Sequence, residues 1–265
     1  MPDLERDGWR LWFEQAGTGP AVVLIHGLLM DHTMFDAQVS ALSDRFGFVL
    51  PDLRGHGQSE HRAEEYTQWD LMEDHVALLD HLGIDRAVWG GVSQGGFQSL
   101  RAALRHPDRV AGLVLIDTQA GPEDETRGEM YEAFAGEIAA NGWNDEIARV
   151  AAMPMFGASA DPALVARWQE RWRAQETRDA PEVLRVVTRR DDVTERLAEI
   201  QAPAVVIHGE EDFAIDMERA EALAAGLPAA GEVVRIARAG HSSTVEAPEA
   251  LTEAIAAFLD GLEDW

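Results

Sequence analysis

The segment GGVSQGGF, residues 90–97, is the most informative part of the sequence for predicting the fold. Ser93 stands between two pairs of glycines and is separated from each pair by one residue. Glycine weakens helices and strands, so four glycines in eight residues indicate a backbone that passes close to other parts of the chain. The apolar run AVWGG precedes the serine, and the amphipathic run QGGFQSLRAALRHP follows it. This order predicts a sharp turn between a strand and a helix that lifts the Ser93 hydroxyl clear of a sheet.

Outside this turn, short apolar runs alternate with longer amphipathic segments. Seven runs predict strands: RLWFEQ, AVVLIHG, FVLPD, AVWGG, LVLID, AVVIHG and EVVRI. Helical periodicity marks residues 34–42, 70–82, 94–104, 217–225 and 248–262. Buried strands separated by helices predict an α/β fold, with a mainly parallel central sheet and helices on both faces.

One segment, residues 121–200, interrupts this alternation. It carries no strand signal and is too long for an ordinary connection between two strands. We therefore expect a core domain of residues 1–120 and 201–265 with an inserted helical cap, or lid, of residues 121–200. We expect most of the large apolar side chains of this segment to form the core of the lid and one or two to face a pocket; they are Trp143, Met153, Met155, Phe156, Trp168 and Trp172.

Composition excludes several classes of function. The chain has 48 acidic residues against 22 basic ones, all arginine, which gives a formal net charge of −26. Such a charge repels nucleic acid and anionic membranes, so we expect neither as a partner. The absence of cysteine excludes disulfides, thiolate metal sites and a cysteine nucleophile. The first residues show no export signal and no run is long enough to span a membrane, so the expected location is the cytoplasm.

A serine hydroxyl needs a base, and the base needs an acid that orients it. Among nine histidines, His241 follows the last predicted strand in a loop just before the final helix, and it is the candidate base. His26 and His208 each end a strand in the tripeptide IHG, where a structural hydrogen bond is expected. Asp212, in the loop after the penultimate strand, is the candidate acid; Asp117, at the end of the strand after Ser93, is its rival. The order Ser93, Asp212, His241 is the one found in serine hydrolases with a strand–turn–helix nucleophile.

With these residues placed, the chain resembles the α/β-hydrolase superfamily over almost its whole length. The resemblance is to its capped members, which include small esterases, perhydrolases and enol-lactonases. It rests on five motifs in order: LIHGLLMDHTMF, LPDLRGHGQS, GVSQGG, HGEED and AGHSSTVEAPE. It implies an oxyanion hole built from the backbone N–H groups of Leu28 and Gln94. Many relatives have Met or Leu where this chain has Gln94, and the serine nucleophile separates it from the dehalogenases and epoxide hydrolases that use aspartate.

The activity implied is hydrolysis of carboxylic esters or lactones through an acyl-enzyme. We expect a small, mostly uncharged substrate, no metal or organic cofactor, and a possible homodimer. Two alternatives stay open: an enol-lactonase for a carboxylated substrate, and a slow-turnover ligand receptor with an intact triad. A cofactor-independent oxygenase or lyase that uses mainly the histidine and aspartate is a third.

Overall fold

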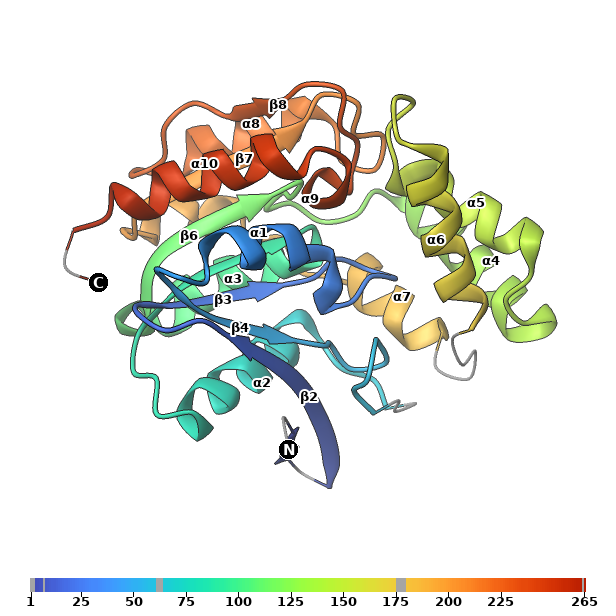
Figure 1. The fold of residues 1–265 in the computed structure, drawn as a ribbon. Helices are drawn as coiled ribbons and strands as arrows, with labels where there is room; N and C mark the ends of the chain where they lie inside the picture. Colours follow the sequence, from blue (N-terminus) through green and yellow to red (C-terminus); the bar gives the residue numbers. More distant parts are fainter. Residues whose placement is uncertain (1–2, 7, 61–63, 175–179, 264) are drawn as a thin grey trace.

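The computed structural model describes residues 3–6, 8–60, 64–174, 180–263 and 265. In this part of the chain eight strands form one sheet in the order β1-β2-β4-β3-β5-β6-β7-β8 (Figure 1). Strands β3 to β8 run parallel, whereas β1 and β2 join the edge of the sheet antiparallel. The strands are β1 (Asp3–Arg6), β2 (Trp9–Ala16), β3 (Ala21–Ile25), β4 (Gly47–Pro51), β5 (Ala87–Val92), β6 (Val110–Ile116), β7 (Ala204–Gly209) and β8 (Val234–Ile236).

Both faces of the sheet are covered by helices, because successive side chains of each strand point to opposite faces. In β3, Val22 and Leu24 belong to one hydrophobic core, while Val23 and Ile25 belong to the other. The helices outside the 121–200 segment are α1 (Asp36–Leu42), α2 (Gln68–His81), α3 (Gln94–Arg105), α8 (Met217–Gly226), α9 (Ser243–Glu246) and α10 (Pro248–Asp260), with short 3₁₀ turns η1 (His32–Phe35) and η2 (Pro107–Arg109). The α/β fold predicted from the alternation of runs is therefore confirmed.

Strand β1 was not predicted from the sequence. Its four residues, DLER, contain a single apolar side chain, and none of the four is buried. Leu4 pairs with Leu11 across the β1–β2 hairpin, so the neighbouring strand, more than the residues of β1, determines this element.

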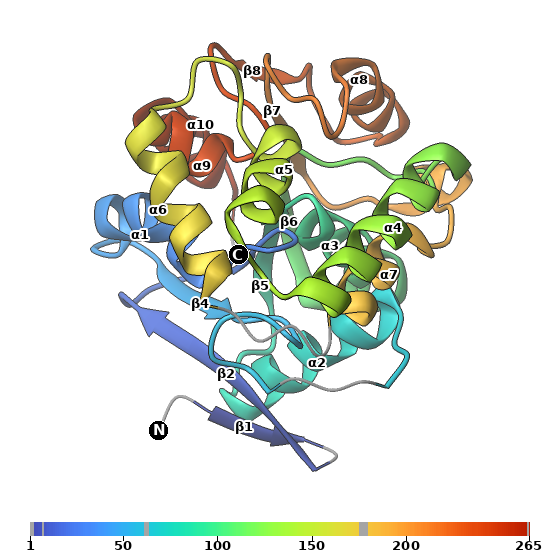
Figure 2. The same ribbon diagram turned by 90° about the vertical axis from the view of Figure 1, so that its right-hand side faces the viewer.

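Among the residues described between β6 and β7 lie four helices, α4 (Glu125–Asn141), α5 (Asp145–Met155), α6 (Pro162–Arg173) and α7 (Ala180–Thr188), followed by η3 (Thr194–Glu199). Asp124, Asn144 and Asp161 cap the first three by accepting backbone N–H bonds. The group lies beyond the carboxyl ends of the parallel strands (Figures 1 and 2). The limits 121 and 200 for a separate lid stay a prediction.

The large apolar side chains of these helices pack mainly inward. Met155, Phe156, Trp168 and Trp172 are buried, whereas Met153 is 62% exposed and differs from the expectation. Within the described residues, no helix is both long and apolar enough to cross a membrane.

Candidate active site

The turn at Ser93 joins β5 to α3 in the way that its glycines predicted. Ser93 has φ 53° and ψ −113°, a conformation that L-residues rarely adopt. A Cβ added at Gly91 or at Gly95 would lie only 2.4 or 2.1 Å from the carbonyl oxygen of Ile25. Only glycine fits at these two positions, and the turn therefore holds Ser93 at the carboxyl edge of the sheet, at the start of a helix.

The loops after β7 and β8 bring together the two other predicted residues. His241 Nδ1 lies 2.8 Å from Asp212 Oδ2, and both side chains are buried. The other oxygen of Asp212, Oδ1, accepts hydrogen bonds from the backbone N–H groups of Ala214 and Ile215, at 2.8 and 2.9 Å. The carboxylate is held from both sides, so His241 donates its Nδ1 proton to Asp212 and keeps Nε2 as the basic nitrogen.

The environment of His241 favours proton uptake. Burial lowers the pKa of His241, but the charge of Asp212 and its hydrogen bond outweigh burial, and the pKa is raised from its ordinary value. An imidazole of raised pKa beside a fixed carboxylate suits a base that receives a proton during reaction and later returns it.

Ser93 is tied to this pair through the neighbouring strand end. Its N–H donates to Ile116 O at 2.9 Å, and the Thr118 hydroxyl donates to Ser93 O at 2.7 Å. Two residues after His241, the Ser243 hydroxyl contacts Asp117 Oδ2 at 2.6 Å. Within the described residues Ser93 Oγ makes no hydrogen bond to His241, and such bonds often tighten only when substrate binds.

Leu28 and Gln94, the residues implied for an oxyanion hole, flank Ser93 at the ends of β3 and β5. No hydrogen bond from the N–H of either residue is found within the described part of the chain. Leu29, which follows Leu28, has a φ of 62°, and the indole Nε1–H of Trp172 on α6 donates to its carbonyl oxygen at 2.7 Å. The helices between β6 and β7 therefore contact the loop that carries Leu28.

Two glutamates join the same helical segment to the other loops of the site. The carboxylate of Glu246 accepts from the N–H groups of Gly157 and Ser242 at 2.9 and 3.1 Å. Glu211, next to Asp212, accepts from both the N–H and the hydroxyl of Ser159. Hydrogen bonds thus link the turn between α5 and α6 to the loops that carry Asp212 and His241.

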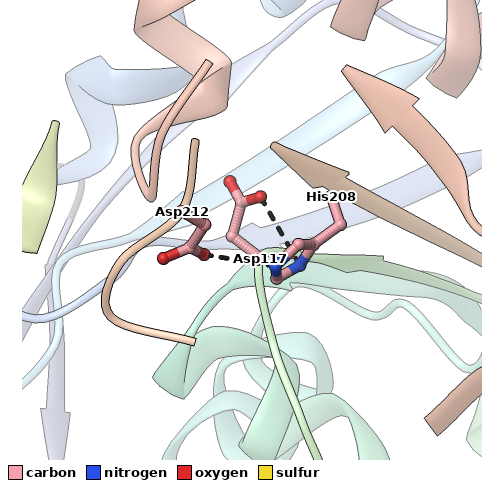
Figure 3. A group of neighbouring side chains, drawn as sticks. All are labelled: Asp117, His208 and Asp212. Carbon is pink, nitrogen blue, oxygen red and sulfur yellow. Dashed lines mark ion pairs between the residues drawn. The ribbon is translucent and has the colours of Figure 1, made fainter. Parts of the chain in front are cut away.

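A second group of buried side chains lies behind the Asp212–His241 pair. Asp117 and Asp212 approach the imidazole of His208 from two sides (Figure 3). Asp117 Oδ1 lies 3.8 Å from His208 Nδ1, and Asp212 Oδ2 lies 3.5 Å from His208 Nε2. His208 Nε2 also donates to Ile215 O at 2.9 Å, which agrees with the structural hydrogen bond expected for this histidine.

These three residues are the one set of possible metal ligands found among the described residues, and their geometry does not suit a metal. The two carboxylates face opposite nitrogens of the ring, and Nε2 is already committed to a carbonyl oxygen. A metal needs ligand atoms that converge on one point.

A cavity of about 370 Å³ is lined by none of the predicted site residues. Its lining includes Gln119, Glu123, Asp124 and Arg219. Arg219 lies within 4 Å of carboxylate oxygens of both Glu123 and Asp124, so its charge is already matched there.

Comparison with known proteins agrees with this geometry. A family model described as alpha/beta hydrolase fold matches residues 20–248. The structure superposes on a malate-bound thermophilic esterase from Thermogutta terrifontis with a TM-score of 0.91 and 30% identity, covering 99% of this chain and 98% of the other. It also superposes on the enol-lactonase from Burkholderia xenovorans LB400 with a TM-score of 0.90 and 28% identity, covering 98% of this chain and 100% of the other. A protein provisionally named carbamate hydrolase RutD, from Caulobacter sp. (strain K31), is 31% identical over 94% of this chain and 96% of its own length.

The fold, the serine turn and these matches define the class: the chain belongs to the α/β hydrolase family. The chain is therefore a hydrolytic enzyme, and the proteins it resembles include an esterase and two enol-lactonases.

Proposed function

We propose that the protein is a serine hydrolase that cleaves esters or lactones through an acyl-enzyme intermediate. The observation that carries the proposal is the Asp212–His241 hydrogen bond, which lies at the same sheet edge as the strained turn of Ser93. This arrangement would supply a nucleophile after β5, an orienting acid after β7 and a base after β8, all at one edge of the sheet.

In the proposed reaction, Ser93 Oγ attacks the substrate carbonyl carbon while His241 Nε2 takes the hydroxyl proton. Asp212 keeps the proton on Nδ1 and stabilises the imidazolium that forms. The N–H groups of Leu28 and Gln94 stabilise the oxyanion, and the N-terminus of α3 adds a partial positive charge. His241 gives its proton to the leaving alcohol, and then activates a water that releases the acyl group from Ser93.

The substrate we infer is small and mostly uncharged, held under a lid of residues 121–200. Eight arginines of this segment pair with acidic side chains, which leaves less free positive charge for a carboxylate. The pairs are Arg127–Asp124, Arg149–Glu146, Arg171–Asp31, Arg173–Asp145, Arg185–Glu132, Arg189–Glu65, Arg190–Glu123 and Arg196–Glu199. The net charge of −26 further opposes the approach of anionic substrates.

The second candidate is an enol-lactonase that acts on a carboxylated substrate. It is favoured by the likeness to the Burkholderia enol-lactonase and by 28% identity, over 92% of this chain, to 3-oxoadipate enol-lactonase 1 of Acinetobacter baylyi. One comparison separates the two candidates.

We expect a neutral ester to be hydrolysed at least about tenfold more efficiently than a dicarboxylate half-ester of equal length, because eight arginines of residues 121–200 already pair with acidic side chains and the net charge of −26 repels a second carboxylate. The measurement is kcat/KM for the two esters at the same ionic strength, with Ser93→Ala as the background. A higher kcat/KM for the half-ester would favour the enol-lactonase.

A further inference from the structure

Asp117 lies in the candidate active site but has no role in the proposed mechanism. It ends β6, with φ 46°, and its side chain is fully buried. Its Oδ1 accepts from the N–H of Gly209 at 2.8 Å, and its Oδ2 contacts the hydroxyl and the N–H of Ser243 at 2.6 and 3.3 Å. Gly209 is three residues before Asp212, and Ser243 is two residues after His241. One carboxyl group therefore joins the two loops that carry the proposed acid and base.

The groups that face Asp117 are Asp212 in the loop after β7, His208 in β7, and His241 in the loop before α9. Burial and the charge of Asp212 raise the pKa of Asp117, and they outweigh the opposite effect of a protonated His241. In the described part of the chain no arginine pairs with Asp117. A buried carboxylate here would lie beside a second carboxylate, Asp212, that already holds His241.

The tautomer of His208 also disfavours an ionised Asp117. Its Nε2 carries a hydrogen, because it donates to Ile215 O, and burial lowers the pKa of His208, which keeps the ring neutral. His208 Nδ1 is then a bare acceptor, buried and without a hydrogen-bond partner among the described residues, 3.8 Å from Asp117 Oδ1. In an ionised Asp117 the charged Oδ1 would face the acceptor Nδ1 of His208, and this repulsion is weaker when Asp117 is protonated and neutral.

We propose that Asp117 is a positioning residue that works as a neutral carboxylic acid: it holds the loops of Asp212 and His241 together and leaves Asp212 as the single negative charge of the site. This inference rests on the proposed function for the roles of Asp212 and His241. The neutral form can keep these contacts: Oδ1 accepts from the N–H of Gly209, and a proton on Oδ2 is donated to the Ser243 hydroxyl, in place of the bond that an ionised Oδ2 accepts from that hydroxyl.

Titration follows from the same surroundings. Burial, and then the charge of Asp212, raise the pKa of Asp117 to about 8 from an ordinary value of 3.8. Between these two values the folded protein keeps the proton and the unfolded chain loses it, so the contribution of Asp117 to stability falls as pH rises through this window. An asparagine, which is always neutral, has no such dependence.

The test that needs no activity compares melting temperatures of wild type and Asp117→Asn from pH 5 to pH 8. We expect the difference, variant minus wild type, to increase by at least about 4 °C over this range. The matched control is Asp191→Asn. Partial burial raises the pKa of Asp191, but the charge-assisted hydrogen bonds that its carboxylate accepts from Arg101 outweigh burial, and the pKa is lowered. Asp191 is therefore ionised throughout this pH range, and the difference in melting temperature between Asp191→Asn and wild type should stay constant. A flat or falling difference for Asp117→Asn would show an ionised Asp117 and overturn the proposal.

The second test measures positioning in the active enzyme. Asp117→Asn should keep kcat at pH 7 within about tenfold and leave the acid limb of the pH profile in place, because a neutral Asp117 does not act on the pKa of His241. Asp117→Ala should lower kcat more than tenfold with little change in KM, and Ser243→Ala, which keeps the carboxyl group, should lower it about three- to tenfold.

Each outcome of this second test is decisive. An acid limb moved down by a full pH unit in Asp117→Asn would show that Asp117 is charged, and a kcat within twofold of wild type in both alanine variants would show that it positions nothing. If Asp117→Ala does not fold, Ser243→Ala carries the second result alone. The melting experiment is independent of Ser93, so an active Ser93→Ala would overturn the proposed function and leave the protonation of Asp117 to be judged on its own.

Discussion

Ser93→Ala is expected to lower ester hydrolysis by about three orders of magnitude or more, because the proposed acyl-enzyme forms on the Ser93 hydroxyl. The residual rate should come from the oxyanion hole and from substrate binding alone. The measurement is kcat/KM on a panel of p-nitrophenyl esters and lactones at a pH where His241 is neutral.

The substitution is well matched for this purpose. Alanine keeps the Cβ of Ser93 and therefore the same backbone strain at φ 53°, so the melting temperature should change little. A variant that retains more than a tenth of wild-type activity would refute the serine mechanism. Very low turnover of the wild type on every ester, with Ser93, Asp212 and His241 intact, would instead point to a ligand receptor.

Asp212→Asn is expected to lower kcat by about 10⁴-fold, and Asp117→Asn by less than tenfold. The reason is the fixed position of Asp212 Oδ1, which accepts two backbone N–H bonds. An asparagine must place its oxygen there, and its NH₂ group then faces His241 Nδ1. That nitrogen has to become an acceptor, the proton moves to Nε2, and the base is lost.

Rates of both variants at one pH, with circular dichroism as the check on folding, decide between the two acids. The reverse ranking would assign the acid to Asp117 and would contradict both the proposed mechanism and the neutral state of that residue.

Local signals in the sequence account for most of the fold and for the positions of the proposed site residues. Apolar runs mark β2 to β8, and the glycines around Ser93 mark the turn, because each signal depends on residues close together in the chain. Asp212 and His241 were placed by a general rule, that loops at the carboxyl ends of neighbouring parallel strands meet.

The rest depends on pairings between distant segments. Nothing near Trp172 in the sequence predicts that its indole reaches Leu29, 143 residues away. Similarly, Asp117 could be recognised as a rival acid, but its contacts with Gly209 and Ser243 exist only once three strand ends are side by side. Contacts between distant segments leave no periodic pattern in the sequence, so they cannot be predicted from it.

The Trp172–Leu29 hydrogen bond has a consequence for protein engineering. Arg171 adds to it by pairing with Asp31 and donating to the Thr33 hydroxyl, so helix α6 supports the loop of Leu28. A chimaera that receives the helices of a relative would acquire new pocket walls and at the same time lose this support. With Leu28 in the proposed role, we expect such a chimaera of this chain to change in catalytic rate as well as in substrate range, unless the transplanted segment carries a tryptophan at the position of Trp172.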